Sequence, residues 1–128
     1  MNQKVLVVDD DTVSRLVLAH MVARLGHDVL QAEDMAGAEK LAAEARPDLV
    51  LADFCLPDGT AIDLLSNLYA AGITARFVVV TGVAEYVSMC SRPADNVPAV
   101  IQTLTKPVGS RVLARCLVDA LDSPGRPA

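Results

Sequence analysis

The amino-acid sequence predicts an α/β domain in which a parallel β-sheet is covered by helices on both faces. Short apolar runs of strand length alternate five times with segments of helical periodicity, as parallel sheets with right-handed crossovers require. Hydrophobic residues make up 52% of the 128 residues but aromatic residues only 3%, so Val, Leu, Ile and Ala must build the core. Strands that are buried on both faces have this composition.

The elements are placed by their periodicity and by the residues that flank them. Asp11 and Asp34 can cap the N-termini of two helices, and Gly26 suits the residue after the end of the first helix. A turn is expected at 57–60 and a polar loop at 92–98. The expected strands are 5–8, 29–32, 49–52, 77–80 and 99–104, and the expected helices are 12–25, 35–45, 61–71, 84–91 and one that starts near Ser110.

Four of the expected helices carry an apolar stripe, which is typical of a helix that packs one face on a core. The stripe of the first helix comprises Val13, Leu16, Val17, Met21 and Leu25, and that of the last comprises Val112, Leu113, Cys116, Leu117, Ala120 and Leu121.

Charge and cysteine content exclude several classes of function. A net charge of −5 repels phosphate backbones and anionic lipids, so we expect no nucleic-acid partner and no membrane partner. The apolar run after Lys4 is too short for a signal peptide or a spanning helix. Three cysteines, Cys55, Cys90 and Cys116, form no paired spacing, which fits a reducing, cytoplasmic location.

Polar side chains follow four of the predicted strands at their carboxyl ends. These ends meet at one edge of a parallel sheet, where ligands bind in open α/β folds. We therefore expect the side chains to converge. They are Asp9, Asp10 and Asp11 after the first strand, Asp53 after the third, Thr81 after the fourth and Lys106 after the fifth.

This set of residues indicates phosphoryl-transfer chemistry. Carboxylates without His or Cys partners suit Mg²⁺ or Mn²⁺. A carboxylate that remains free can act as a nucleophile and form an acyl phosphate. A Lys and a Thr hydroxyl at the same edge would neutralise and orient phosphoryl oxygens. The sequence thus predicts transfer of a phosphoryl group onto or through an Asp, assisted by a divalent metal.

The chain resembles the receiver domain of response regulators in two-component signalling. The motifs that carry the resemblance are VLVVDDD at 5–11, DLVLADFCLPDGT at 48–60, VVVTG at 78–82 and LTKPV at 104–108. The resemblance implies a flavodoxin-like (βα)5 three-layer sandwich with a parallel sheet in the order 2-1-3-4-5. The receiver domain would span residues 1–122, and 123–128 would form a short C-terminal tail.

The resemblance also implies a role for each matching residue. Asp53 is similar to the phosphate-accepting aspartate, and Thr81 and Lys106 match the hydroxyl and ammonium groups that contact the phosphoryl group. The implied Mg²⁺ ligands are Asp10 directly, Asp9 through water, Asp53, and the backbone carbonyl of Cys55.

A receiver is a signalling domain rather than an enzyme. The resemblance implies that a sensor histidine kinase or a histidine phosphotransfer protein donates the phosphoryl group and docks near Val13 and Leu16. Phosphorylation would switch binding to a downstream protein, with the chain a monomer or a phosphorylation-dependent dimer. Thr103 stands where the family commonly has an aromatic switch residue. Cys55 and Val83 stand where the family tunes hydrolysis, and neither side chain suits an attacking water, so we expect slow autodephosphorylation.

Two alternatives remain at this point. Asp9, Asp11, Val13 and Thr81 match the first two motifs of haloacid-dehalogenase-like phosphatases, but the chain is short for that fold and no acidic pair follows Lys106. A degenerate receiver that acts only as an interaction module is the other alternative, although all the acidic, Thr and Lys positions are present.

Overall fold

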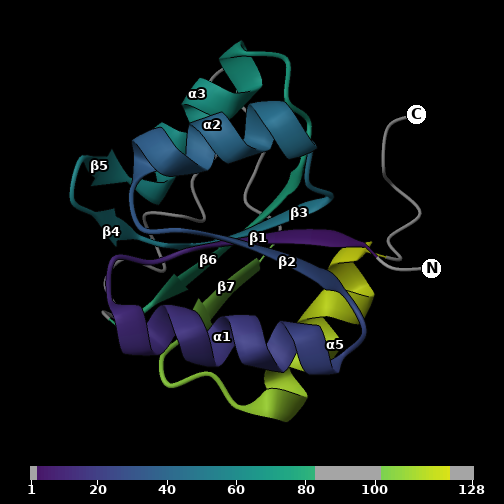
Figure 1. The fold of residues 1–128 in the computed structure, drawn as a ribbon. Coiled ribbons are helices and arrows are strands. Elements are labelled where there is room, and N and C mark those ends of the chain that lie inside the picture. Colours follow the sequence, from purple (N-terminus) through teal and green to yellow (C-terminus); the bar gives the residue numbers. More distant parts are fainter. Residues whose placement is uncertain (1–2, 83–101, 122–128) are drawn as a thin grey trace.

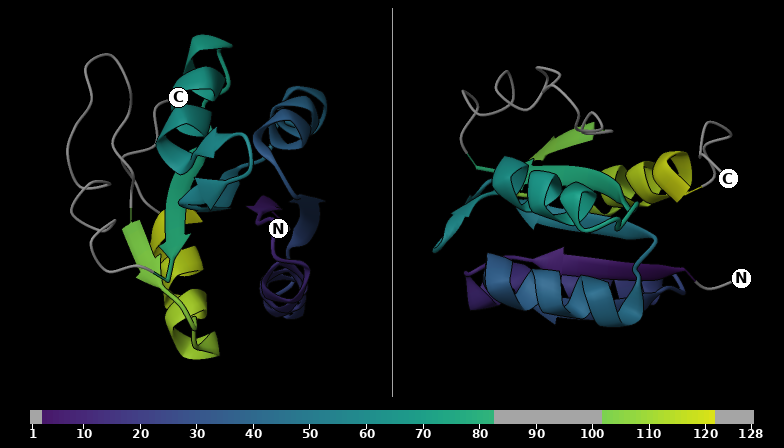
Figure 2. Two further views of the ribbon diagram at one scale, coloured as in Figure 1. Left: turned by 90° about the vertical axis from the view of Figure 1, so that its left-hand side faces the viewer. Right: turned by 90° about the horizontal axis from the view of Figure 1, so that it is seen from above.

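Five parallel strands form a single sheet with helices on both faces (Figures 1 and 2). The computed structural model describes residues 3–82 and 102–121. The strand order is β2-β1-β3-β6-β7, which confirms the predicted order, because β6 and β7 are the fourth and fifth strands of this sheet. The strands are β1 (Lys4–Val8), β2 (Asp28–Ala32), β3 (Leu49–Asp53), β6 (Arg76–Thr81) and β7 (Gln102–Thr105).

The described helices divide evenly between the two faces. Helices α1 (Thr12–Arg24) and α5 (Ser110–Leu121) cover one face, and α2 (Met35–Ala45) and α3 (Ala61–Ala70) cover the other (Figure 1). The predicted caps are confirmed, since Asp11 accepts a hydrogen bond from Ser14 N and Asp34 accepts one from Gly37 N. Gly26 follows α1 with a φ of 92°, a left-handed conformation that glycine adopts without strain.

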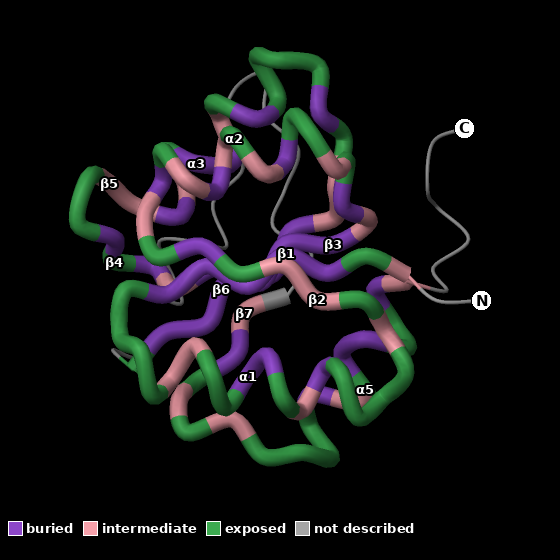
Figure 3. The backbone as a smooth tube through the Cα atoms, in the orientation of Figure 1, coloured by how far each residue is buried: buried purple, intermediate pink, exposed green. Residues whose placement is uncertain are grey.

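Alternate residues of each strand face opposite helix layers and build two cores. In β1, Val5 and Val7 pack toward α1 and α5, whereas Leu6 and Val8 pack toward α2 and α3. All four side chains are buried, and Figure 3 shows the central strands buried along most of their length. No helix among the described residues is both long and apolar enough to cross a membrane.

Most of the apolar stripe predicted for α1 lies outside the core, although Met21 is partly buried and packs against it. Val13, Leu16 and Val17 are 70%, 51% and 52% exposed, and α1 packs on the sheet through Leu18, Ala19 and Val22 instead. The helical periodicity did not identify the core-facing side of α1, because this helix carries apolar side chains on more than one face. On α5 the stripe is largely confirmed, since Leu113, Cys116, Leu117 and Ala120 are buried, but Val112 is 52% exposed.

The remaining differences concern the ends of elements. Asp53 and Thr81 are the last residues of their strands rather than the first residues after them. The predicted turn at 57–60 belongs to a small antiparallel hairpin of β4 (Cys55–Leu56) and β5 (Gly59–Thr60). The helix predicted at 84–91, the loop at 92–98 and the first part of the fifth strand, 99–101, lie outside the described residues.

Two leucines of α1 provide a matched test of the packing. Leu18→Ala should lower the free energy of unfolding by about 2–5 kcal/mol, because it removes a side chain that is only 5% exposed and leaves a cavity. Leu16→Ala, on the exposed side of the same helix, should change it by less than about 0.5 kcal/mol. Urea denaturation measures both values. Equal losses for the two variants would contradict the observed orientation of α1.

Candidate functional site

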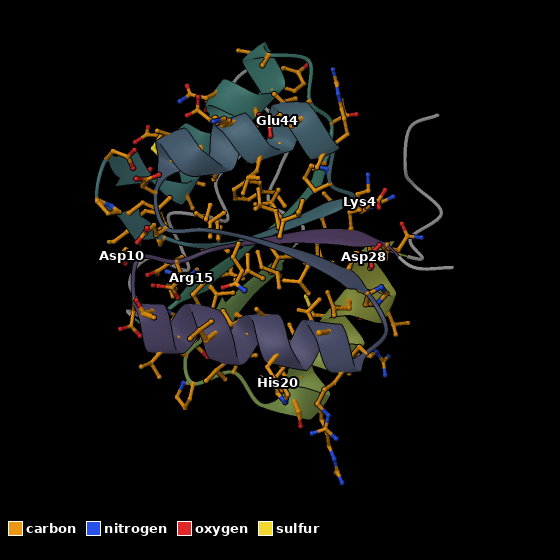
Figure 4. All side chains as sticks on the ribbon, in the orientation of Figure 1. Lys4, Asp10, Arg15, His20, Asp28 and Glu44 are labelled. Atoms are coloured by element: carbon orange, nitrogen blue, oxygen red, sulfur yellow. The ribbon has the colours of Figure 1, made fainter. Side chains whose placement is uncertain are left out.

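The predicted site residues meet at the carboxyl edge of the sheet. Asp9 follows β1, Asp53 ends β3, Thr81 ends β6 and Lys106 follows β7. Parallel pairing places these ends side by side, since Val8 pairs with Ala52, Asp53 with Val80, and Thr81 with Thr105. Figure 4 shows Asp10 at this edge, close to the start of α1.

Lys106 is shared between two carboxylates. Its Nζ lies 2.8 Å from Asp9 Oδ2 and 3.4 Å from Asp53 Oδ2. Asp9 is fully buried, and its other oxygen accepts a hydrogen bond from Asp11 N at 3.0 Å. Both Asp9 oxygens therefore have partners, which offsets the cost of burying this charge.

The pKa values of Asp53 and Lys106, which are both partly buried, move in the same direction. Burial raises the pKa of Asp53; the Lys106 charge opposes this effect, the Asp9 charge adds to it, and the net shift is upward. Burial works to lower the pKa of Lys106, but the hydrogen bond to Asp9 and the charges of Asp53 and Asp9 outweigh it and raise that pKa. Lys106 therefore remains an ammonium group at neutral pH.

Three carboxylates fit a divalent cation. Asp9, Asp10 and Asp53 each place an oxygen within 4.8 Å of the others. Lys106 is the only ammonium group paired with them among the described residues, so the group carries more negative than positive charge when ionised. Asp10 is exposed and forms no ion pair within the described part of the chain. An all-oxygen set with an open side is the type of site that Mg²⁺ prefers.

Thr81 and Cys55 are the other two residues predicted for the site. Thr81 is 2% exposed, and its backbone carbonyl accepts a hydrogen bond from Lys106 N at 2.8 Å, which ties the end of β6 to the residue after β7. Cys55 begins β4, two residues after Asp53, and its side chain is exposed. Thr103 lies in β7 opposite Val79 and is half-buried.

Sequence reasoning missed Arg15. Its Nη1 donates to the backbone oxygen of Asp9 at 3.0 Å, and its Nε donates to Gln31 Oε1 at 3.3 Å. Arg15 thus holds the turn that carries the acidic residues against β2. Figure 4 shows it at the same end of α1 as Asp10. A basic residue one turn into the helix after an acidic cluster was the available signal.

Sequence reasoning also assigned Asp58 only to a turn. Its carboxylate accepts hydrogen bonds from Met35 N at 2.8 Å and Ala36 N at 3.1 Å, so it caps α2 from the loop that follows Asp53. The neighbouring Gly59 packs so closely on Met35 that a Cβ there would collide with the Met35 sulfur. The segment after the candidate acceptor is therefore fixed to the start of α2.

Parallel strands that end in an acidic group, a buried Thr and a paired Lys define a class of α/β domains with an acidic site at the carboxyl edge of the sheet. Within that class, the profile of the response regulator receiver domain matches residues 5–117, and the chain belongs to this family. The match gives no support to the phosphatase alternative.

Curated relatives and a solved structure agree with this assignment. The chain is 31% identical over 85 residues to sporulation initiation phosphotransferase F of Bacillus subtilis, covering 66% of this chain and 68% of that protein. It is 35% identical over 109 residues to the transcriptional regulatory protein KdpE of Mycobacterium tuberculosis, covering 82% of this chain and 45% of that protein. The receiver domain of Erythrobacter litoralis PhyR superposes with a TM-score of 0.83 at 25% identity, covering 99% of this chain and 95% of that one.

Other relatives are much longer than this chain. The DNA-binding transcriptional regulator NtrC of Azospirillum brasilense is 27% identical over 124 residues, which is 97% of this chain but 25% of that protein. The chain spans about a quarter of the length of that regulator and less than half of KdpE.

The cap on α2 predicts a pH-dependent contribution to stability. The backbone hydrogen bond from Met35 N, with that from Ala36 N, lowers the pKa of Asp58. A carboxylate with a lowered native pKa stabilises the fold above its unfolded pKa of about 3.9, and this stabilisation is lost as the pH falls through the native pKa. Asp58→Asn should therefore be less stable than the wild type at neutral pH, and the difference should shrink in acid.

Thermal or urea unfolding across an acidic pH series measures this difference. Asp28→Asn is the control, because the Asp28 side chain has no hydrogen bond or ion pair within the described residues, and it should be as stable as the wild type at neutral pH. A stability gap for Asp58→Asn that stays constant down to about pH 2 would rule out the carboxylate as the source.

Proposed function

We propose that Asp53 accepts a phosphoryl group from the phosphohistidine of a sensor histidine kinase or a histidine phosphotransfer protein, and that this modification switches binding to a downstream partner. The observation that carries the proposal is the position of the Asp53 carboxylate, 3.4 Å from the Lys106 ammonium at the acidic edge of the sheet. Family membership supports it, since receiver domains interact with histidine kinases or phosphotransfer proteins.

Each residue of the site has a defined task in this reaction. An Asp53 oxygen forms the new O–P bond as the P–N bond to the donor histidine breaks, and the histidine nitrogen keeps the electron pair. Lys106 and the Thr81 hydroxyl contact the phosphoryl oxygens and balance their charge. Asp9, Asp10 and Asp53, with the backbone carbonyl of Cys55, would hold Mg²⁺, which supplies further charge neutralisation.

The proposal predicts Mg²⁺-dependent labelling of Asp53. Incubation with acetyl phosphate and Mg²⁺ should add one base-labile phosphoryl group to the wild type and none to Asp53→Ala, as measured by intact mass. Asp28→Ala removes a carboxylate from the start of β2, outside the site, and should be labelled like the wild type. Lack of labelling in all three, with no capture of beryllofluoride, would indicate a degenerate receiver. Label that survives Asp53→Ala but disappears in Asp9→Ala would indicate the phosphatase-like alternative.

The proposed docking surface of the phosphodonor is a groove beside Lys106. Val13 and Val17 of α1 and Pro107 and Val108 of the following loop line a hollow of about 390 Å³. These apolar side chains are at least partly exposed, and the groove adjoins the one ammonium group that contacts Asp53 among the described residues. A helix that carries the donor histidine would bury them while it reaches the site.

A charged substitution in this groove tests the surface. Val17→Asp should slow transfer from a phosphorylated histidine phosphotransfer domain by roughly tenfold or more, because it places a charge in a desolvated contact. Labelling by acetyl phosphate should not change. Val118→Asp on α5 is the matched control, since Val118 is 54% exposed and Val17 is 52% exposed. Equal slowing by both variants would argue against this docking surface.

Slow loss of the acyl phosphate is part of the proposal. Cys55 is exposed beside Asp53, and its thiol is poorly suited to orient an attacking water. Val83, the second predicted position, lies outside the described residues. Cys55→Asn combined with Val83→Glu should speed the decay, followed by intact mass after removal of the donor. Unchanged decay in the double variant would contradict this part of the proposal.

Four further points stay predictions. They are a switch without an aromatic residue at Thr103, a monomer or a phosphorylation-dependent dimer, a cytoplasmic location, and a downstream protein partner.

A further inference from the structure

A second hollow lies between the C-terminal half of α1 and the first turns of α5, and we propose that it docks an acidic amphipathic helix of a protein partner. We call it the cationic cleft. Its volume is about 390 Å³. Figure 4 shows His20 on the side of α1 that faces away from the sheet. Its lining combines the basic residues His20, Arg24 and Arg111 with Ser110 and the apolar residues Met21, Leu25 and Ala114.

The charge of the residues that line the cleft indicates an acidic partner. The chain as a whole carries a net charge of −5, yet two arginines and a histidine from two helices meet at this cleft. None of the side chains that line it is acidic. Within the described residues, neither Arg24 nor Arg111 forms an ion pair. Neighbouring cations without a counter-charge repel one another, and an acidic partner would remove this repulsion.

Arg24 and Arg111 have opposite effects on the stability of the helices in which they lie. Arg24 lies in the last turn of α1, where a cation interacts favourably with the helix dipole. Arg111 lies in the first turn of α5, where a cation is unfavourable and where no acidic residue compensates it. The presence of Arg111 at this position is therefore not explained by the stability of α5. It is explained by recognition of an anionic group at the cleft.

The apolar part of the lining favours a helix over a free anion. An inorganic anion would make no use of Met21, Leu25 and Ala114, whereas the apolar face of an amphipathic helix would cover them. A third helix also packs readily in the groove between two others.

The exposed stripe of α1 extends this surface. Val13, Val17, Met21 and Leu25 are spaced four residues apart and form one ridge along α1, about 18 Å long at 1.5 Å per residue. The ridge runs from the groove beside Lys106 to the cationic cleft. The apolar residues that the core leaves exposed therefore continue into the docking surface. This inference stands without phosphorylation of Asp53.

Peptide binding tests the inference. The probe is a fluorescein-labelled helical peptide with Leu on one face and Glu on the flanks, and the comparison peptide has Gln in place of Glu. Fluorescence anisotropy should show that the full chain binds the Glu peptide at least tenfold more tightly than the Gln peptide. Added salt should reduce the difference.

Arg111→Glu is the decisive variant because an acidic residue in the first turn favours α5, so loss of binding cannot be attributed to unfolding. It should weaken binding of the Glu peptide at least tenfold without lowering the melting temperature. Lys40→Glu makes the same change of charge at an exposed position of α2, on the opposite face of the sheet, and should leave binding unchanged.

The inference would be overturned if the Glu peptide did not bind or if the two peptides bound equally. It would also be overturned if Arg111→Glu and Lys40→Glu weakened peptide binding equally. Equally effective competition by free glutamate would overturn it as well and would indicate a small-anion site. Dimerisation of the chain through Arg111 without peptide binding would assign the cleft to a second copy instead. Labelling by acetyl phosphate, measured in parallel on the same variants, reports on Asp53 separately and should not change.

Discussion

The ion pair between Lys106 and Asp9 is the contact on which the arrangement of the site depends. Asp9 follows β1 and Lys106 follows β7, and in the sheet these strands are separated by β3 and β6. The pair therefore joins residues 97 positions apart, across the carboxyl edge from β1 to β7. Asp53 ends one of the strands in between, which is why its carboxylate lies within 3.4 Å of the same ammonium group. Without Lys106, the buried Asp9 carboxylate would lose its counter-charge, a strongly destabilising change.

Because the Lys106 ammonium group is shared by two carboxylates, a change at Asp53 can also affect the surface beside Lys106. In the proposed function, a phosphoryl group on Asp53 adds negative charge and competes with Asp9 for Lys106. Pro107 and Val108 follow Lys106 directly and line the groove against α1, and α5 begins at Ser110. A movement of Lys106 would therefore be transmitted to the loop that connects the groove with the cationic cleft. The proposed chemistry at Asp53 and the proposed binding along α1 and α5 would thus be physically adjacent.

The sequence was sufficient for the fold and for the convergence of polar side chains at one edge of the sheet, because both follow from patterns along the chain. Alternating apolar runs predict a parallel sheet, and polar residues at strand ends must then meet at one edge. The sequence was not sufficient for contacts that depend on packing between elements. The exposed ridge of α1 was unpredictable because that helix has apolar residues on more than one side. Arg15 and Asp58 were missed because each bonds to the backbone of another element, Asp9 and the start of α2 respectively.

The central claim is that Lys106 pairs with Asp9 when Asp53 is unmodified and contacts the phosphoryl group when Asp53 is phosphorylated. The chain has three lysines, Lys4, Lys40 and Lys106, so nitrogen NMR of the side-chain ammonium groups gives few signals to assign, and Lys106→Arg identifies the relevant one. On addition of Mg²⁺ and beryllofluoride, a phosphoryl mimic, the Lys106 signal should shift in the wild type and stay fixed in Asp53→Ala. A Lys106 signal that does not move while the mimic is bound, or that moves equally in Asp53→Ala, would contradict the account.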